Sequence, residues 1–237
     1  MKIRTVIFDL DNTLYDYNHC HILGLHQAFQ QWQNLNQTES FEEFQHLYQK
    51  SREWVKRFLF DTPSSHSRAL YFQKLVEKVE GFPNTYKIIQ LYDAYNNGFY
   101  KELVPFPHLI EVINELKKRK FQLAVVTNML AEIQYRKLTL LNLGDTFDFI
   151  ITSQAVEHEK PHPLIYAHTL TLTQSKPNET IMIGDSFNDD IEPSTWIGTH
   201  AIWFNPRKIS PPSSINRKYY VISEYSQLLS IIDEINT

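Results

Sequence analysis

Two aspartates separated by one residue, Asp9 and Asp11, follow an apolar run at residues 3–8 that predicts a buried strand. Side chains alternate between the two faces of a strand, but this constraint stops where the strand stops, so both carboxylates can reach one point in space. Carboxylates held this close repel each other unless a cation or a shared proton relieves the repulsion. Because open α/β sheets bind ligands beyond the carboxyl ends of their strands, the pair indicates a cation site.

Three further apolar runs are followed by polar residues of different chemistry. These are Thr127 and Asn128 after residues 121–126, Lys160 in the loop after residues 147–151, and Asp185, Asp189 and Asp190 after residues 181–183. Parallel strands place their carboxyl ends at one edge of a sheet. We therefore expect a hydroxyl, an amide, an ammonium and further carboxylates to lie beside the first pair.

This set of groups suits phosphoryl transfer. A carboxylate can attack phosphorus to give an aspartyl-phosphate, which divides the reaction into two steps. Mg²⁺ prefers carboxylate, phosphate and water oxygens, and with Lys160 it can cancel the charge of the two reacting anions. Thr127 can help to stabilise the equatorial oxygens of the transition state. Asp11 can protonate the leaving oxygen and then deprotonate water.

The elements that must position these residues fall into two groups. From residue 104 onward strands and helices alternate, which predicts parallel strands with right-handed crossovers. Between them and the first strand lie four segments of helical periodicity, at residues 18–32, 41–60, 66–79 and 86–99. We expect an α/β fold, with a Rossmann-like three-layer core around a central parallel sheet and an all-helical inserted domain. The core comprises residues 1–15 and 100–237, and the insertion residues 16–99.

The polar residues resemble the four motifs of the haloacid dehalogenase-like hydrolase superfamily. Asp9-Leu10-Asp11-Asn12-Thr13 matches the first motif, Thr127-Asn128 the second, Lys160-Pro161 the third, and Gly184-Asp185 with Asp190 the fourth. Each motif is weak alone, but all four occur in the family's order and span nearly the whole core. Met129 stands where glycine is frequent in the family, and this departure removes no catalytic group.

The resemblance implies a role for each matching residue. Asp9 would be the nucleophile and a ligand of Mg²⁺, and Asp11 the general acid and base, with its backbone carbonyl on the metal. The phosphoryl group would be bound by Thr127, Asn128 and Lys160. The metal would also be held by Asp185 and supported by Asp190, with Asp189 as the alternative, because some family members use the shorter spacing.

A helical insertion at this position is similar to the cap domain of one subgroup of the superfamily. That subgroup includes phosphoglycolate phosphatase, N-acylneuraminate-9-phosphatase and nucleotidases of the YjjG type. Such caps close over small substrates and exclude water. The leaving group must then be recognised by side chains outside the core, and we single out Arg68 first, then Arg52 and Tyr15. For the two arginines, a solvated helix face is the alternative interpretation.

We therefore expect Mg²⁺-dependent hydrolysis of a small phosphomonoester through an aspartyl-phosphate. A sugar phosphomutase of the same superfamily stays open as an alternative, because it also uses both aspartates. A dehalogenase or a phosphonatase is disfavoured, because neither chemistry has a carboxylate in the role of Asp11. The alternative from a different functional class is a non-catalytic ligand-binding or scaffold protein with the same fold. The presence of all the candidate catalytic groups argues against this alternative.

Composition narrows the range of partners. The chain has 237 residues with a formal net charge of −4, which does not indicate a broad basic surface. We expect a small phosphorylated metabolite as its ligand and no nucleic acid polymer. No run of about 18 apolar residues exists, so we expect no membrane span. The lone cysteine, Cys20, fits a reducing cytoplasm, and both a monomer and a homodimer are compatible with the sequence.

Overall fold

The computed structural model describes residues 2–35, 38–212 and 217–237. The chain divides into two compact units, one made of Met1–Asp16 and Val104–Thr237 and the other of Tyr17–Leu103. We call the first unit the core and the second the helical unit. The helical unit is thus inserted into the core sequence just after the first strand.

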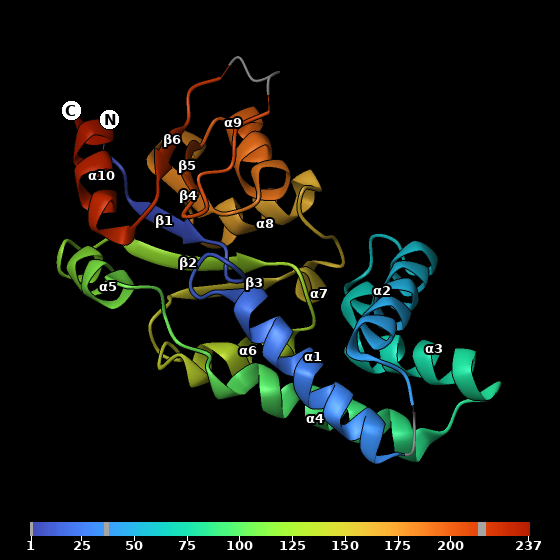
Figure 1. Ribbon diagram of the computed structural model, residues 1–237. Helices are drawn as coiled ribbons and strands as arrows, with labels where there is room; N and C mark the ends of the chain where they lie inside the picture. Colours follow the sequence, from blue (N-terminus) through green and yellow to red (C-terminus); the bar gives the residue numbers. More distant parts are fainter. Residues whose placement is uncertain (1, 36–37, 213–216) are drawn as a thin grey trace. The chain divides into compact units, whose positions relative to one another are not determined.

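A six-stranded parallel sheet forms the centre of the core (Figure 1). Its strands are β1 (Thr5–Phe8), β2 (Gln122–Thr127), β3 (Phe149–Thr152), β4 (Thr180–Gly184), β5 (His200–Phe204) and β6 (Tyr220–Ile222), in the spatial order β3-β2-β1-β4-β5-β6. In the register, Ile7 of β1 lies opposite Ala124 of β2 and Met182 of β4. The strands that precede the first, second and fourth motifs are therefore neighbours, and their carboxyl ends lie at one edge of the sheet.

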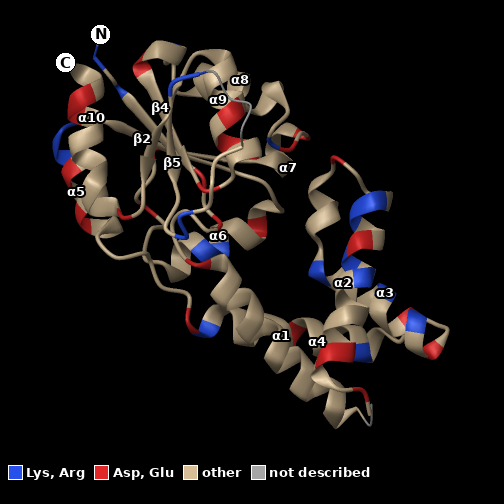
Figure 2. Cartoon of the chain, turned by 45° about the horizontal axis from the view of Figure 1, so that its top comes forward, with Lys and Arg blue, Asp and Glu red and all other residues tan. Residues whose placement is uncertain are grey.

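Helices cover both faces of this sheet. They are α5 (Leu109–Lys118), α6 (Ala131–Leu140), α7 (Ser153–Val156), α8 (Pro163–Leu172), α9 (Glu192–Ile197) and α10 (Leu228–Asn236). Figures 1 and 2 show α5 and α10 on one side of the sheet and α8 and α9 on the other. Ile165 and Tyr166 of α8 pack against Ile7, Val126 and Met182 in one buried cluster. The expected α/β fold, with a Rossmann-like three-layer core and an all-helical addition, is confirmed.

The segment after β4 forms two consecutive helical elements. A π-helical turn, η3 (Phe187–Ile191), precedes α9. The Ser186 hydroxyl accepts the Asp189 N–H at 3.2 Å and so starts this turn, while Pro193 lies in the first turn of α9. The extra turn brings Asp190 back toward the end of β4, which matters for the site below.

The helical unit contains α1 (Tyr17–Asn34), α2 (Phe41–Phe58), a 3₁₀ turn η1 (Pro63–His66), α3 (Arg68–Glu80) and α4 (Thr85–Lys101). A capping box between Ser40 and Glu43 starts α2, which satisfies donors that a helix end leaves open. The third helix begins at Arg68 rather than at residue 66, because η1 comes first and Ser67 accepts the Leu70 N–H. The fourth helix continues to Lys101, so the unit ends at Leu103 rather than at residue 99.

The interior of the helical unit is mainly aromatic. Its fully buried side chains include Trp32, Phe44, Tyr48, Phe72 and Tyr95. The axes of α1 and α4 approach closely at Gly98, where an added Cβ would lie 2.5 Å from the Leu23 carbonyl oxygen. A larger residue at this position would push the two helices apart.

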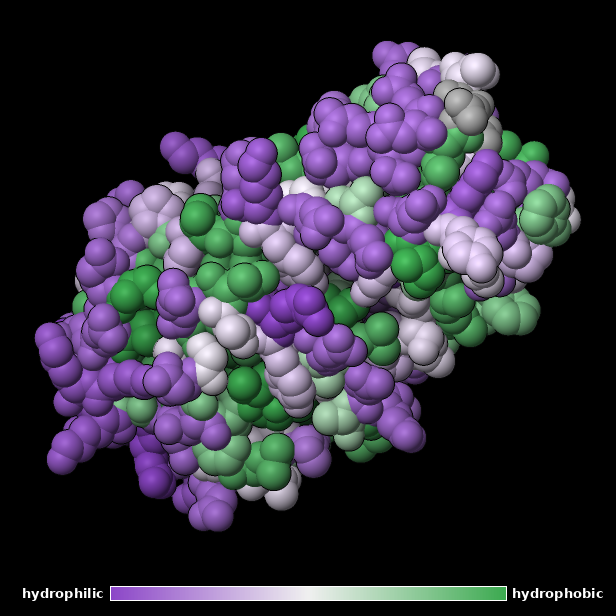
Figure 3. Space-filling model, turned by 90° about the horizontal axis from the view of Figure 1, so that it is seen from below, coloured by the Kyte–Doolittle hydropathy of each residue, from purple (hydrophilic) through white to green (hydrophobic). Residues whose placement is uncertain are grey.

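On the molecular face of Figure 3, hydrophilic side chains (purple) are interspersed with hydrophobic ones (green). Among the described residues, no helix combines the length and the apolar character needed to cross a membrane.

Candidate active site

Asp9 follows β1 directly and is 6% exposed. Its Oδ2 accepts a hydrogen bond from the Thr13 hydroxyl at 2.9 Å, and its Oδ1 lies 2.6 Å from the Lys160 ammonium. The same Thr13 hydroxyl accepts the Asp185 N–H at 3.1 Å, so the first motif is tied to the end of β4. Each Asp9 oxygen therefore has a fixed partner, which holds the carboxylate in one orientation.

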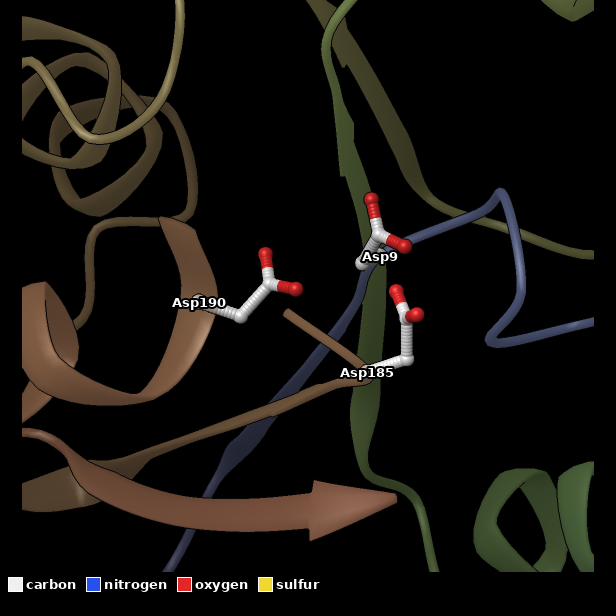
Figure 4. Close-up of side chains that lie close together, drawn as sticks. All are labelled: Asp9, Asp185 and Asp190. Carbon is white, nitrogen blue, oxygen red and sulfur yellow. The ribbon is translucent and has the colours of Figure 1, made fainter. Parts of the chain in front are cut away.

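Three carboxylates meet at this edge of the sheet. One oxygen from each of Asp9, Asp185 and Asp190 lies within 4.8 Å of the others. Figure 4 shows that the three side chains come from the end of β1, the end of β4 and the turn η3, and that they point toward one another. Gly184 makes this convergence possible, because a Cβ there would lie 2.3 Å from the Asp190 carboxyl group.

The cluster resists ionisation without a cation. Burial, and then the nearby Asp9 and Asp190 charges, raise the pKa of Asp185 to about 8. Burial is also the main cause that raises the pKa of Asp190 to about 7, although Lys160 opposes it. A hard divalent cation with oxygen ligands would relieve this repulsion, so the donor set fits Mg²⁺.

Lys160 is the one ammonium inside the carboxylate cluster, among the residues that the structure describes. Its Nζ lies 2.6 Å from Asp190 Oδ1 as well as from Asp9 Oδ1. Burial lowers the pKa of Lys160, but the carboxylates of Asp190 and Asp9 outweigh burial and raise this pKa well above its usual value. The lysine therefore stays charged beside the candidate nucleophile.

Asn128 positions this lysine through its backbone. The Asn128 amide donates to the Lys160 carbonyl at 2.9 Å and accepts the Lys160 N–H at 2.7 Å. The side chain thus clamps the third motif to the second, and its expected contact with the phosphoryl group stays a prediction. The next residue, Met129, has a φ of 145°, a backbone conformation that favours glycine.

The buried Thr127 hydroxyl lies at the end of β2 and accepts a hydrogen bond from Gln134 Nε2 at 2.5 Å. The same Gln134 nitrogen lies 3.3 Å from Asp11 Oδ2. Gln134 therefore connects the hydroxyl of the second motif with the second carboxylate of the first motif.

Asp11 has a further partner that the sequence reasoning missed. The Lys137 ammonium, on α6, donates to both Asp11 oxygens at 2.6 and 2.9 Å. The Tyr15 hydroxyl also donates to this carboxylate. Lys137 is 1% exposed. The signal available in the sequence was the spacing of Gln134 and Lys137, which places these two polar side chains on the same face of a helix.

The remaining predicted residues lie outside the carboxylate cluster of Asp9, Asp185 and Asp190. The Asp189 carboxylate accepts a hydrogen bond from the Ser186 hydroxyl at 3.0 Å and is not a member of the carboxylate cluster. Of the two adjacent aspartates, the geometry therefore brings Asp190 to the site. Tyr15 is buried in the core, where it contacts Asp11. Arg68 and Arg52 belong to the helical unit, Arg68 as a buried residue and Arg52 as a half-buried one.

A buried carboxylate beside an ammonium and two further carboxylates is an arrangement that could bind a divalent cation and an anionic group together. The comparisons define the family. The model for the haloacid dehalogenase-like hydrolases matches residues 6–204, and the chain belongs to this family.

Relatives and solved structures agree with this assignment. Ribulose-1,5-bisphosphate 5-phosphatase from Halopiger xanaduensis is 34% identical over 205 residues, which cover 86% of either chain. Pyrophosphatase PpaX from Bacillus mycoides is 32% identical over 240 residues and the full length of both chains. With such relatives, the chain is a phosphatase of the family.

The fold is shared with solved structures of lower sequence identity. The putative hydrolase YfnB from Bacillus subtilis, solved with bound magnesium, has a TM-score of 0.74 and 22% identity, covering 98% of this chain and 100% of its own. A phosphatase of the family from Thermococcus onnurineus has a TM-score of 0.72 and 24% identity, with full coverage of both chains. At these identities the likeness concerns the fold alone.

Proposed function

We propose that this phosphatase hydrolyses a small phosphomonoester with Mg²⁺ through an aspartyl-phosphate on Asp9. The observation that carries the proposal is the buried Asp9 carboxylate, which lies 2.6 Å from the Lys160 ammonium and within 4.8 Å of two further carboxylates. When bound to Asp9, Asp185 and Asp190, Mg²⁺ would supply positive charge that offsets the carboxylates and the substrate phosphate.

The residues of the chain divide the two steps between them. An Asp9 oxygen attacks phosphorus and forms a phosphate–carboxylate bond, while the bond to the leaving oxygen breaks and that oxygen takes a proton from Asp11. The ionised Asp11 then takes a proton from water, the water oxygen attacks phosphorus, and Asp9 is released. Lys160 and the Thr127 hydroxyl hold the phosphoryl oxygens throughout.

Lys137, Tyr15 and Gln134 fix the position of Asp11 for both proton transfers. All three donate hydrogen bonds to its carboxylate. Lys137 also supplies a positive charge, which favours the ionised carboxylate needed in the second step. These contacts support the role of Asp11 as the proton carrier. They also give Asp11 partners different from those of Asp9, as two different roles require.

For the substrate we propose a chemical class rather than one compound. The names of two relatives, ribulose-1,5-bisphosphate 5-phosphatase and pyrophosphatase, each denote a substrate with two phosphate groups. A panel should therefore contain sugar bisphosphates and pyrophosphate beside simple phosphomonoesters. Product analysis on the same panel separates hydrolysis from a mutase reaction, because hydrolysis releases inorganic phosphate and a mutase yields an isomer.

The decisive test uses p-nitrophenyl phosphate as a generic substrate. Phosphate release should require Mg²⁺, and Asp9→Asn should lower kcat by at least about a thousandfold, because the amide is a poor nucleophile. Asp145→Asn is the matched control, since Asp145 is exposed in a loop of the core, and it should keep wild-type activity. Activity that survives Asp9→Asn would rule out Asp9 as the nucleophile.

A further inference from the structure

Tyr225 is far from the four motifs in the sequence but contacts the first of them in the core. The residue is fully buried, and its hydroxyl donates a hydrogen bond to the Thr13 carbonyl oxygen at 2.7 Å, across 212 positions of the chain. The region that the family model matches ends at residue 204. The segment beyond this region therefore contributes a polar contact to the loop that follows Asp9.

Two local features fix the position of this tyrosine. It is the first residue of a 3₁₀ turn, η4 (Tyr225–Gln227), which follows β6 closely. The Gln227 side-chain oxygen accepts the Ser223 N–H at 2.8 Å, which holds the chain between β6 and η4. The tyrosine ring stacks on Phe204 of β5, with 4.8 Å between the ring centres. Backbone and ring thus hold the hydroxyl against the first motif.

Thr13 is the residue through which this hydroxyl acts on the carboxylates. The Thr13 side-chain oxygen donates to Asp9 Oδ2 at 2.9 Å and accepts the Asp185 N–H at 3.1 Å. The carbonyl oxygen of the same residue accepts the Tyr225 hydroxyl. A shift of the Thr13 backbone would therefore move the oxygen that orients Asp9 and joins the first motif to the end of β4.

The backbone of Asp185 is held separately, by Trp203. The indole Nε1–H of Trp203 donates to the Asp185 carbonyl oxygen at 2.9 Å. Trp203 lies in β5 opposite Gly184, and its ring packs edge-to-face on Phe187 with 5.1 Å between the ring centres. Because Asp185 has this second support, loss of the tyrosine hydroxyl should move the loop after Asp9 relative to Asp185.

The Tyr225 hydroxyl stays protonated beside the carboxylates. Burial, and then the charges of Asp9 and Asp185, raise the pKa of Tyr225 well above its ordinary value. A protonated hydroxyl can donate, whereas a carbonyl oxygen can only accept. The donor of the hydrogen bond to Thr13 is therefore present throughout the neutral pH range.

We propose that Tyr225 is a positioning residue of the active site, whose hydroxyl fixes the Thr13 backbone and thereby the placement of Asp9 relative to Asp185. These are two of the three carboxylates that would share the divalent cation. The inference rests on the proposed function, because it assigns Tyr225 to the metal site proposed there. Groups that orient metal ligands without touching the metal commonly change its affinity when they are removed.

A purely structural role for this hydroxyl would give a different result. A buried hydroxyl that donates to a carbonyl oxygen stabilises a protein wherever it lies, so a lower melting temperature alone does not identify a positioning residue. Tyr71, in α3 of the helical unit, is the matched control, because it is also buried and its hydroxyl donates to the Ser65 carbonyl oxygen. Tyr225→Phe and Tyr71→Phe each remove one such hydrogen bond and keep the ring.

Metal affinity distinguishes the two roles. The probe is Mn²⁺, which shares the oxygen ligands of Mg²⁺ and can be followed by the electron paramagnetic resonance signal of the free ion. The dissociation constant of Mn²⁺ should rise by about tenfold in Tyr225→Phe and stay at the wild-type value in Tyr71→Phe. The half-maximal rate of phosphate release should need correspondingly more Mg²⁺ in Tyr225→Phe only. Equal Mn²⁺ affinities of Tyr225→Phe and the wild type would overturn the inference.

Amide hydrogen exchange tests the same inference without metal or substrate. The Asp185 N–H is bonded to the Thr13 side-chain oxygen. In Tyr225→Phe this amide should exchange at least about tenfold faster relative to the amides of β2, because the loop opens locally. Tyr71→Phe should leave this ratio unchanged. The wild-type ratio in Tyr225→Phe would contradict the inference, whereas a changed ratio in a protein that neither binds Mn²⁺ nor releases phosphate would contradict the proposed function alone.

Discussion

At the residue scale, Asp9 and Asp11 lie only two positions apart, but their side chains have different neighbours. Asp9 lies against Lys160 and two other carboxylates, whereas Asp11 lies against Lys137, Tyr15 and Gln134. In the proposed mechanism, the first environment would present a carboxylate to an anionic substrate, and the second would hold a carboxylate that exchanges protons. The proposed separation of roles thus depends on α6, which the four motifs do not include.

Lys137 provides a test of this division. Lys137→Met keeps much of the side-chain volume and removes the bidentate contact with Asp11, so kcat should fall by about 10- to 100-fold as the proton carrier loses its fixed position. The loss should be larger for alkyl phosphates than for p-nitrophenyl phosphate, because p-nitrophenolate leaves without a proton. Steady-state kinetics on both substrates measures this difference.

Arg136→Met is the control for that experiment. Arg136 is the preceding residue of the same helix, and its guanidinium forms an exposed pair with Glu132 at 3.3 Å. Its replacement should leave both rates within twofold of the wild type. If Lys137→Met reduced the two substrates by the same factor, Lys137 would not act through the proton transfer of Asp11.

At the element scale, the approach of η3 to the end of β4 assembles the carboxylate cluster. Gly184→Ala should displace Asp190, because the new Cβ would lie 2.3 Å from its carboxyl group. Overpacking of this kind costs about 1–3 kcal/mol of folding free energy. We expect urea unfolding to show this loss and Mg²⁺ titration of activity to show a higher metal requirement.

Gly144→Ala is the matched glycine substitution in the core. Its added Cβ would lie 3.8 Å from the nearest atoms of Thr139, an ordinary contact distance, so the stability and the Mg²⁺ requirement should change little. Identical behaviour of the two alanine variants would show that the close approach at Gly184 does not position Asp190.

The strand ends could be predicted from the sequence because their signals are local. Apolar runs end at Phe8, Val126 and Ile183, and a polar residue follows each within two positions, so the edge of the sheet could be located without knowledge of the packing. The face that α6 turns to the sheet depends on tertiary packing instead. For this reason Gln134 and Lys137 escaped prediction, and the burial of Arg68 among tyrosines could not be distinguished from a solvated helix face.

At the scale of the whole molecule, the carboxylate cluster links the stability of the protein to pH and to metal. Burial raises the folded-state pKa of Asp185 to about 8 and that of Asp190 to about 7, against an ordinary pKa of 3.8 for each. Between those limits the metal-free folded state binds more protons than the unfolded state. Its stability therefore falls as pH rises toward 8, by up to about 1.4 kcal/mol per pH unit for each group.

The titration of His21 changes the stability of the folded protein in the opposite direction, over a lower pH range. Burial lowers its pKa in the folded state to about 3, below the ordinary pKa of 6.5, so its contribution to stability increases with pH and is complete above about pH 6.5. The interval from pH 6.5 to 8 therefore reports mainly on the carboxylate cluster, and it is the interval in which the melting temperature should be compared between variants.

We expect the melting temperature of the metal-free protein to fall between pH 6.5 and 8, and Mg²⁺ to raise it more at pH 8 than at pH 6.5. The cation binds the deprotonated carboxylates, so at lower pH it must displace protons before it can stabilise the folded state. Asp185→Asn removes a titrating group and should flatten both dependences, whereas Asp145→Asn, at an exposed loop position, should not. A Mg²⁺ shift that is the same at both pH values in the wild type would show that the cluster is not the metal site.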